Sequence, residues 1–560
     1  MFLHLELIIF QYINRDLKLR NNMLTGDYII IGGGTAACVL ANRLSKNPAN
    51  EIILLESGGK PDHAKLSIPA SFYQMFKSRY DWNFHTVPQK QVNNRKMYQP
   101  RGKMLGGCSQ LNAMIYIRGA AKDYDEWAAM GNHLWSYKKV LPYFKKGKNN
   151  FSIDSQYHTK SGEQNISNHR VIGHLTNEFI ASAQANGFKH NPDFNGKDQA
   201  GVGTYQLFQK GGKRESVYDS FLKPIQKRKN LRIITGATVK KILFEDNKAE
   251  FVEYYENGKQ KKVKARREVI LCAGTFGSPQ ILMRSGIGDV NELKEHGIIP
   301  RMAISEVGKN LQDHLAFGIN VETHERHSYD GNDKLPKLIK PLLQYLLFKR
   351  GPLTSNIAEG GAFFKTDKSL PAADFQILFA PATFIKHGFL DLGNHKGFTM
   401  GACHLQPESR GTVKLKNKSL RAAPLIDPNY MSAEGDREAL VKGYKAIQKI
   451  LYSNPLIKYI KKEKFPSKKL ESSDEILDFL KTYIQTLYHP VGTCRMGLDL
   501  ESVVDQRLKV RGVVGLRVVD ASVMPKIIRG NTQAPVMMIA ERAAEFILKD
   551  RLTLSTRMVY

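Results

Sequence analysis

The chain has 560 residues, 42% of them hydrophobic, and its 83 basic and 53 acidic residues give a formal net charge of +30 at pH 7. This composition excludes a disordered or fibrous chain, and a length well above about 300 residues predicts more than one domain. The basic excess is scattered in short clusters, which favours a solvated surface over a nucleic-acid-binding tract and leaves attraction to an anionic bilayer as the alternative.

The cysteines and the distribution of apolar residues bear on the compartment. Five cysteines stand far apart without a C-x-x-C pair, so neither a disulfide framework nor a zinc site is indicated. The apolar run from Phe2 to Phe10 is interrupted by Glu6, is too short to span a bilayer and lacks the features of a signal peptide. No later segment offers about 18 consecutive apolar residues. We expect a cytoplasmic protein without a metal, in which residues 1–25 form an extension and Met23 is an alternative start.

The first predicted elements form a strand–helix–strand unit. Tyr28–Ile31 is an apolar run typical of a buried parallel strand, and Cys38–Leu44 has the apolar stripe of a helix. Ile52–Glu56 is a second buried strand, which ends in an acid. Between the first strand and the helix, Gly32–Ala37 fits the pattern G-x-G-x-x-A. This order predicts one complete βαβ unit opened by a glycine loop.

The glycine loop has the chemistry of a phosphate-binding turn. Gly32 allows the tight turn, Gly34 lets the backbone approach a pyrophosphate, and the small Ala37 lets helix and strand pack closely. The helix N-terminus adds free N–H groups and a positive dipole end. Glu56, at the end of the next strand, can bind ribose hydroxyls. The unit therefore predicts a dinucleotide site, and by itself it does not separate FAD from NAD.

Further strands are expected on both sides of a long middle region. Asn247 and Asn257-Gly258 mark turns, which places the basic run Lys259–Arg267 near a hairpin tip. A strand at 515–520 and a helix from Ala534 to Leu548, with Pro535 in its first turn, close the chain. Residues 316–488 lack another glycine loop and are expected to form a second domain. The strands predicted before this region are Leu231–Ile234, Val239–Phe244, Ala249–Tyr255 and Val263–Leu271.

Sequence blocks along the chain resemble, in order, the signatures of the glucose–methanol–choline (GMC) oxidoreductases. The first block runs from Gly102 to Tyr116 and continues to Trp127, and the second runs from Gly274 to Gly288. Shorter matches follow at Val307–His314, Pro407–Gly411, His489–Thr493, Asp520–Ser522 and Gly530–Thr532. Because the resemblance extends from about Asp27 to Leu548, it is far more specific than the glycine loop alone.

The resemblance implies an α/β fold, with a Rossmann-like FAD-binding domain and a second, α+β substrate-binding domain. It assigns residues 26–155, 226–315 and 489–550 to the discontinuous FAD-binding domain, and 156–225 and 316–488 to the substrate-binding domain. The cofactor contacts that it implies are Gly32, Gly34, Thr35, Ala36, Glu56, Arg101, Gly102, Leu105, Gly106, Gly107, Asn112, Ala113, Met114, Val239, Ala273, Gly274, Asp520, Ala521, Asn531 and Thr532.

The resemblance also implies catalysis by a histidine and an asparagine, which match His489 and Asn531. Alcohol oxidation removes a hydroxyl proton and a hydride from one carbon, and a neutral imidazole can take the proton near pH 7. The hydride goes to flavin N5, and Asn531 can orient the substrate oxygen. Taken without the motif, His489 is a structural histidine before a proline and Asn531 caps a turn. His314, in the same family match, is expected to be structural and near a domain junction.

Two positions in the first block depart from what relatives show. Some choline-oxidising relatives attach FAD through a histidine just before Asn112, and here that position is Leu111. We therefore expect FAD to be held noncovalently. Cys108 stands where glycine or serine is more usual, and we expect it to fit sterically without being reactive.

The sequence around His489 and Asn531 favours a primary, aliphatic alcohol as substrate, since it resembles the bacterial alcohol dehydrogenase branch. The alternative is choline dehydrogenation to betaine aldehyde. Two other classes remain: a flavin photoenzyme acting on fatty acids, and a basic binding protein without catalysis. By analogy we expect a quinone or another carrier as electron acceptor, and the basic surface adds the hypothesis of peripheral membrane contact.

Overall fold

The structure is a computed structural model that describes residues 23–324, 327–332, 335–388 and 396–557. The apolar run from Phe2 to Phe10 and most of the expected N-terminal extension lie outside these residues. Two seven-stranded sheets organise the described part of the chain. None of the helices described there combines the length and the apolar composition that crossing a bilayer requires.

The first sheet gathers strands from distant parts of the sequence in the order β10-β2-β1-β13-β12-β11, with β24 beside β13. β1 pairs in parallel with β2 and β13, whereas β12 runs antiparallel to both β11 and β13. Nearly all side chains of the parallel core are buried, as expected for strands covered on both faces. The strands are β1 (Leu24–Ile31), β2 (Ile52–Glu56), β10 (Leu231–Thr235), β11 (Ala237–Glu245), β12 (Lys248–Glu256), β13 (Lys259–Leu271) and β24 (Leu516–Val518).

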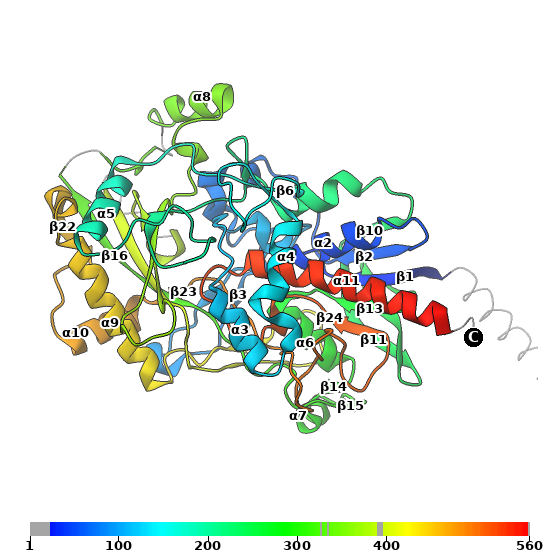
Figure 1. The fold of residues 1–560 in the computed structure, drawn as a ribbon. Coiled ribbons are helices and arrows are strands. Elements are labelled where there is room, and N and C mark those ends of the chain that lie inside the picture. The colour runs from blue at the N-terminus through cyan, green and yellow to red at the C-terminus, as the bar shows by residue number, and fades with distance from the viewer. Residues whose placement is uncertain (1–22, 325–326, 333–334, 389–395, 558–560) are drawn as a thin grey trace, which may run out of the picture.

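Two helices from opposite ends of the chain pack together beside this sheet. α2 (Thr35–Leu44) follows the glycine loop, and α11 (Gln533–Arg557) contacts it along its length. Figure 1 shows the red C-terminal helix alongside the blue N-terminal strands. Arg43 of α2 forms an ion pair of 2.6 Å with Glu541 of α11. The predicted βαβ unit is therefore confirmed, and the C-terminal helix completes its cover.

The second sheet is antiparallel throughout, in the order β22-β16-β19-β18-β17-β7, with β23 beside β16. α5 (His174–Ala185) and α9 (Glu434–Leu451) pack on this sheet, and α10 (Ser473–Tyr483) rests on α9. Their apolar side chains form one buried cluster with those of the strands. The strands are β7 (Gly201–Thr204), β16 (Leu315–Thr323), β17 (Gly360–Phe364), β18 (Phe375–Ala380), β19 (Gly397–His404), β22 (Ile460–Phe465) and β23 (Gln485–Thr486).

Several element ends differ from the predicted ones. The strand expected at 515–520 is shortened to β24, because Gly515 has a positive φ of 72° and Asp520 caps the following turn. The helix expected to end at Leu548 continues to Arg557. The basic run Lys259–Arg267 lies in β13, where Lys261 and Lys264 pair with glutamates of β12. Its charge is therefore solvated and partly neutralised, as predicted.

Candidate active site

A cavity of about 1250 Å³ is lined by residues of both sheets. Gly32, Glu56 and Val239 contribute to its wall from the first sheet, and Ala316 and Leu378 from the second. The loop after β1 therefore faces the same space as strands that begin almost three hundred residues later in the chain. This position between two sheets is where small-molecule and cofactor sites concentrate in proteins.

The glycine loop adopts the backbone that its sequence predicts. Gly32 has a φ of 98°, and a Cβ there would stand 2.5 Å from the carbonyl oxygen of Cys272. Gly34 is the N-cap of α2, and a Cβ built on it meets no atom within 4 Å, so its backbone faces open space. The N–H groups of the first turn of α2 are thus available to an anion in the cavity.

A second glycine turn supports the first. The N–H of Gly106 donates to the carbonyl of Gly33 at 2.7 Å, and a Cβ on Gly107 would lie 2.9 Å from the Cα of Gly34. Only glycine at both positions lets the two turns approach this closely. The first family block therefore holds the glycine loop from behind while its following residues line the cavity.

Glu56 closes the other side of the loop. Its carboxylate accepts hydrogen bonds from the N–H groups of Gly33, at 2.6 Å, and Gly58, at 2.7 Å. Burial raises the pKa of this carboxyl, and the two backbone donors and Lys103 oppose the rise. Glu56 thus lines the cavity at the end of β2, the position at which the sequence predicts an acid that binds ribose hydroxyls.

Most of the residues expected to contact the cofactor do line the cavity, and two do not. Leu105 is buried in the core cluster of the first sheet, and Gly106 lies behind the loop of Gly33. Their contact with the cofactor stays a prediction, and the structure shows that both residues pack against the glycine loop. The expected residues that line it are Gly32, Gly34, Thr35, Ala36, Glu56, Arg101, Gly102, Gly107, Asn112, Ala113, Met114, Val239, Ala273, Gly274, Asp520, Ala521, Asn531 and Thr532.

The wall retains polar groups and open backbone that suit a dinucleotide. Within the described residues, the Nε–H of Arg101 and the Nε2 amide of Gln533 are buried without a hydrogen-bond acceptor. A Cβ at Gly274 also meets no atom within 4 Å. Buried donors normally have partners, so these groups and the first turn of α2 fit a large ligand with phosphate and ring acceptors. The residues present therefore fit FAD.

Asp520 has a structural task at the edge of this wall. Its Oδ2 accepts from the N–H of Gly274 at 2.9 Å and from Ser278 at 2.6 Å, and its other oxygen accepts from Ser522. The carboxylate thereby fixes the start of α6 (Gly274–Arg284) against the loop after β24. Asp520 lines the cavity, and its oxygens are already engaged by the protein.

The two expected catalytic residues lie side by side at the cavity. The Nδ2 of Asn531 is 3.2 Å from the Nε2 of His489, and Gln376 donates to the amide oxygen of Asn531 at 3.3 Å. The Nδ1 of His489 lies 2.9 Å from the Nδ1 of His314. The other nitrogen of His314, Nε2, is 3.0 Å from the backbone carbonyl oxygen of Leu405.

These contacts assign the tautomers of both rings. A carbonyl only accepts, so His314 carries its proton on Nε2 and its Nδ1 presents a lone pair. His489 must then donate through Nδ1, which leaves its Nε2 unprotonated beside Asn531. The lone pair of a base is thus turned toward the cavity by a chain of hydrogen bonds that ends on the backbone.

The electrostatics keep both rings neutral. Burial lowers the pKa of His489 well below its ordinary value, and the neighbouring His314 and Arg101 lower it further. Burial lowers the pKa of His314 to about 3, while backbone carbonyls of Leu405 and Ile528 act in the opposite direction. At neutral pH the pair therefore has no charge and retains an acceptor at Nε2 of His489.

Asp313 fixes the backbone of both histidines. One carboxylate oxygen accepts the N–H groups of His314, at 2.9 Å, and His489, at 2.8 Å. The other accepts the hydroxyls of Tyr430 and Thr486, each at 2.5 Å. Burial raises the pKa of Asp313, and these hydrogen bonds oppose the rise. A single buried carboxylate thus holds the two histidine-bearing segments together.

The structural role expected for His314 stays a prediction. His314 lies just before β16, where the chain enters the second sheet, as the family match suggested. It also contacts the ring of His489 directly, which places it beside the candidate site. Sequence reasoning missed Asp313, Gln376 and Leu405. Only Asp313, inside a recognised block, carried any signal.

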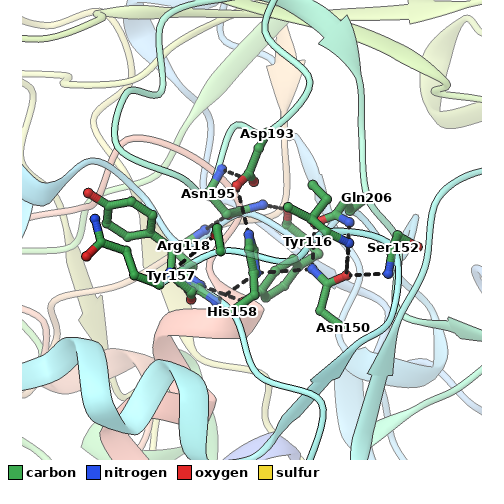
Figure 2. A network of polar contacts seen from close by, with 12 residues as sticks. Tyr116, Arg118, Asn150, Ser152, Tyr157, His158, Asp193, Asn195 and Gln206 are labelled. Atoms are coloured by element: carbon green, nitrogen blue, oxygen red, sulfur yellow. Dashed lines mark hydrogen bonds and ion pairs between the residues drawn. The ribbon is translucent and has the colours of Figure 1, made fainter.

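A buried polar network behind the site supports Asn531. Figure 2 shows the ring of His158 between Asp193, whose carboxylate is 2.8 Å from its Nε2, and the side chains of Asn150 and Arg118. Asn195 accepts from the N–H of Arg118 and donates to the carbonyl of Tyr116. These two hydrogen bonds fix the backbone at 116–118.

This fixed backbone meets the loop that carries Asn531. A Cβ at Gly530 would lie 2.4 Å from the side chain of Ile117, so glycine is required at this contact. The φ of Gly530 is 141°, which also favours glycine. The network therefore fixes the backbone on which the loop of Asn531 packs, and its residues do not line the cavity.

Leu111 and Cys108 both line the cavity. Leu111 is buried in an apolar cluster with Phe72 and Phe76. The sulfur of Cys108 is 3.4 Å from the N–H of Gly102 and 4.0 Å from the Arg101 guanidinium. The cysteine is accommodated in the turn, as its sequence position predicted.

Comparison with known proteins gives one consistent relationship. Models described as GMC oxidoreductase match residues 26–316 and 407–540. An alcohol dehydrogenase [acceptor] of Pseudomonas putida is 41% identical over 528 residues, which cover 93% of this chain and 96% of the relative. The mitochondrial choline dehydrogenase of Homo sapiens is 35% identical, with 93% and 89% covered.

A solved structure agrees with these sequence matches. A variant of a formate oxidase from Aspergillus oryzae, described for the effect of its mutation on FAD modification, superimposes with a TM-score of 0.87 at 25% sequence identity. The superposition covers 95% of this chain and 99% of the oxidase. Two sequence models, near full-length relatives and a shared three-dimensional arrangement therefore point to the same group of proteins.

Proposed function

This chain belongs to the GMC oxidoreductase family, and from that premise we propose that it is an FAD-dependent dehydrogenase that oxidises a primary, aliphatic alcohol to the aldehyde. The observation that carries the proposal is the contact between Nε2 of His489 and the amide of Asn531 at the cavity, with Nδ1 of His489 directed to His314. When FAD is bound, its oxidised flavin ring accepts the hydride from the substrate carbon.

The residues of the chain perform the proton chemistry. A hydroxyl placed at Nε2 of His489 meets a lone pair that can take its proton, and the neighbouring Nδ2 of Asn531 can donate to the same oxygen. His314 keeps His489 in the competent tautomer by accepting from its Nδ1. General base catalysis of this kind contributes roughly 10²–10⁴-fold.

The charge of the cavity wall favours an uncharged substrate over choline. Among the described lining residues the carboxylates are Glu56 and Asp520, and both are engaged by backbone N–H groups at the glycine loop and at α6. A quaternary ammonium prefers a carboxylate or an aromatic cage. The described lining offers it no carboxylate without backbone partners, whereas the lining rings of Phe72, Phe76 and Phe384 suit a cage. Choline is therefore the second candidate, supported by these rings and by the choline dehydrogenase relative.

The proposal extends to the cofactor's attachment and to the acceptor. Leu111 offers no nucleophile for a covalent link, so FAD is held noncovalently by the glycine loop, the Arg101 region and α6. The electrons pass to a quinone, in line with the relative named for its acceptor activity. The test of attachment is acid precipitation of the holoenzyme, which should release all flavin into the supernatant; flavin in the pellet would contradict it.

An anaerobic substrate panel tests the activity. The purified yellow holoenzyme should lose its oxidised-flavin absorbance when it is mixed with primary alcohols of increasing chain length. Choline should bleach the flavin only weakly. Faster bleaching by choline than by the aliphatic alcohols would identify choline as the preferred substrate. No bleaching by either class would refute both. Reoxidation by a soluble quinone analogue faster than by dissolved oxygen is the expected result for the acceptor.

A further inference from the structure

α8 (Ile339–Phe348) exposes apolar side chains on the side that faces away from the protein. A surface helix normally turns its polar side outward, and here the outward side is aliphatic. At 100° per residue the five outward positions fall within an arc of about 140°, while Pro341 and Tyr345 are buried on the opposite side. The outward side chains and their exposed fractions are Ile339 51%, Leu342 37%, Leu343 51%, Leu346 56% and Leu347 68%.

The helix is fixed to the body of the protein by its other side. Tyr345 is only 4% exposed, and its hydroxyl donates to the carbonyl of Ser67 at 3.4 Å. Lys349 ends the helix with a positive φ of 50°, and its carbonyl accepts from Arg170 at 3.0 Å. Figure 1 shows α8 standing at the edge of the molecule, beyond both sheets. The apolar stripe is therefore presented by an anchored helix.

Basic residues surround this stripe. The segment 335–350 contains Lys337, Lys340, Lys349 and Arg350 and no acidic residue. The hairpin of β8 (Gln209–Lys210) and β9 (Lys213–Arg214) touches the end of α8, because a Cβ on Gly212 would stand 2.7 Å from the carbonyl of Lys349. This hairpin adds the exposed Lys210 and Lys213. An apolar stripe with a basic rim is the pattern of a helix that lies in a bilayer interface.

We propose that α8 and its basic rim dock this protein on an anionic lipid bilayer. The stripe presents no polar group that a partner would have to satisfy, and the rim along 335–350 is complementary to lipid phosphates. A fluid surface also needs no shape complementary to a projecting helix. Ten residues of helix extend only about 15 Å, half the hydrocarbon thickness, so α8 lies on the membrane and does not span it.

This inference goes beyond the proposed function and does not depend on the identity of the alcohol or the acceptor. It does place the cavity near the lipid. The turn at Pro352–Thr354 follows α8 directly, and Asn356 and Ile357 after it line the cavity. Docking through α8 therefore brings one wall of the cavity close to the bilayer surface.

Cosedimentation of the holoenzyme with lipid vesicles tests the proposal. We expect binding to vesicles of equal phosphatidylglycerol and phosphatidylcholine, and far weaker binding to pure phosphatidylcholine or in 0.5 M salt. The triple variant Leu343→Ser, Leu346→Ser and Leu347→Ser should lower the partition coefficient on the order of a hundredfold. The matched control is Ile299→Ser, Leu500→Ser and Val514→Ser, whose wild-type side chains are 88%, 87% and 62% exposed elsewhere. It should bind as the wild type does.

A charge variant tests the rim separately. Replacement of Lys337, Lys340 and Arg350 by glutamine should lower binding to the anionic vesicles on the order of a hundredfold at low salt. Replacement of the exposed Lys197, Lys229 and Lys294 by glutamine changes the net charge equally and should have little effect. All four variants must retain the flavin absorbance and the circular dichroism of the wild type. Since the rim variant leaves every apolar side chain in place, it remains informative if the serine variant misfolds.

Three outcomes would overturn the proposal. In the first, the wild type fails to bind the anionic vesicles. In the second, the α8 variants bind as well as their matched controls. In the third, sedimentation velocity shows that the wild type is a dimer and the serine triple variant a monomer, while the wild type does not bind vesicles. The last result would assign the stripe to a second copy of the chain.

Discussion

Two buried histidine clusters among the described residues differ in whether one ring nitrogen lies at the cavity. In the cluster of Figure 2, His158 uses Nε2 on Asp193 and Nδ1 on Asn150 and Arg118. In the cavity cluster, His489 uses Nδ1 on His314 and offers Nε2 to the cavity beside Asn531.

The contrast teaches that a carboxylate partner alone does not identify a catalytic histidine. The ring of His158 is paired with an acid, yet both of its nitrogens are engaged by protein groups and it does not line the cavity of the candidate site. His489 lacks an acidic partner on its ring, and its neutral neighbour assigns its tautomer. The first arrangement holds loops together, and the second presents a base.

The largest expected effect separates the two clusters directly. His489→Ala should retain FAD and lower kcat by about 10²–10⁴-fold, because the base is removed while the cofactor cavity stays intact. Steady-state kinetics and the flavin absorbance of the same preparation measure both quantities. Near-normal turnover would show that the open nitrogen is not the base.

The second largest effect on turnover is expected for Asn531→Ala. Loss of the amide that orients the substrate oxygen should lower kcat/KM on the order of 10²-fold, as for other preorganised donors. Asn531→Asp is the matched variant, since it keeps the size and replaces the donor by an acceptor. Full activity of the aspartate variant would contradict a donor role for Asn531.

His314→Leu should have a smaller effect, on the order of tenfold in kcat, because it removes only the group that fixes the tautomer of His489. KM should change little, since His314 acts through another ring. His314→Asn offers an amide oxygen near the position of Nδ1 and should restore activity to within about threefold. Equal losses of kcat in both variants would show that His314 contributes packing and does not set the tautomer of His489.

His158→Leu should barely change turnover, by no more than about threefold, although it removes buried hydrogen bonds. The free energy of unfolding should fall by about 1–3 kcal/mol, because Asp193 and Asn150 lose partners. Urea denaturation and kcat on one preparation test this. A loss of kcat comparable with that of His489→Ala would erase the distinction between the two clusters.

The pH dependence is expected to be the smallest effect on turnover. With the pKa of His489 well below 6.5 and that of His314 about 3, both rings stay neutral and kcat should vary by no more than about twofold between pH 6 and 8. Stability behaves differently, because unfolded histidines titrate near 6.5. Below that pH the unfolded chain takes up protons that the folded rings refuse, so stability decreases as the pH falls toward 3.

The contribution of one ring can be isolated by comparison. Between pH 6 and 4, His314→Asn should show a pH slope of the unfolding free energy that is shallower than the wild-type slope by up to about 1.4 kcal/mol per pH unit. Identical slopes would mean that His314 is protonated in the folded protein.

Local patterns in the sequence predicted the half of the site that depends on local geometry. The loop from Gly32 to Ala37 lies between β1 and α2, and Glu56 ends β2, because a turn, a helix start and a strand end each leave a mark in neighbouring residues. The motif match also brought His489 and Asn531 to one cavity. Which residues of a turn line the cavity was less accessible, as Leu105 and Gly106 show.

The remaining half depends on pairing between distant segments. His314 meets His489 only because β16 and β23 pair and Asp313 binds both backbones. No spacing in the sequence encodes that meeting. The apolar side of α8 is similar: its leucines are typical of a core helix, and only the position of Tyr345 against Ser67 shows that they face outward.

The completion of the first sheet and its cover by residues 516–557 has a consequence for biosynthesis. β24, Asn531 and α11 are translated after every other part of the cavity, and α11 covers α2 and pairs Glu541 with Arg43. During synthesis the glycine loop emerges early but waits, uncovered, until some five hundred further residues have left the ribosome. A nascent chain thus cannot complete its nucleotide cradle until β24 and α11 have been synthesised.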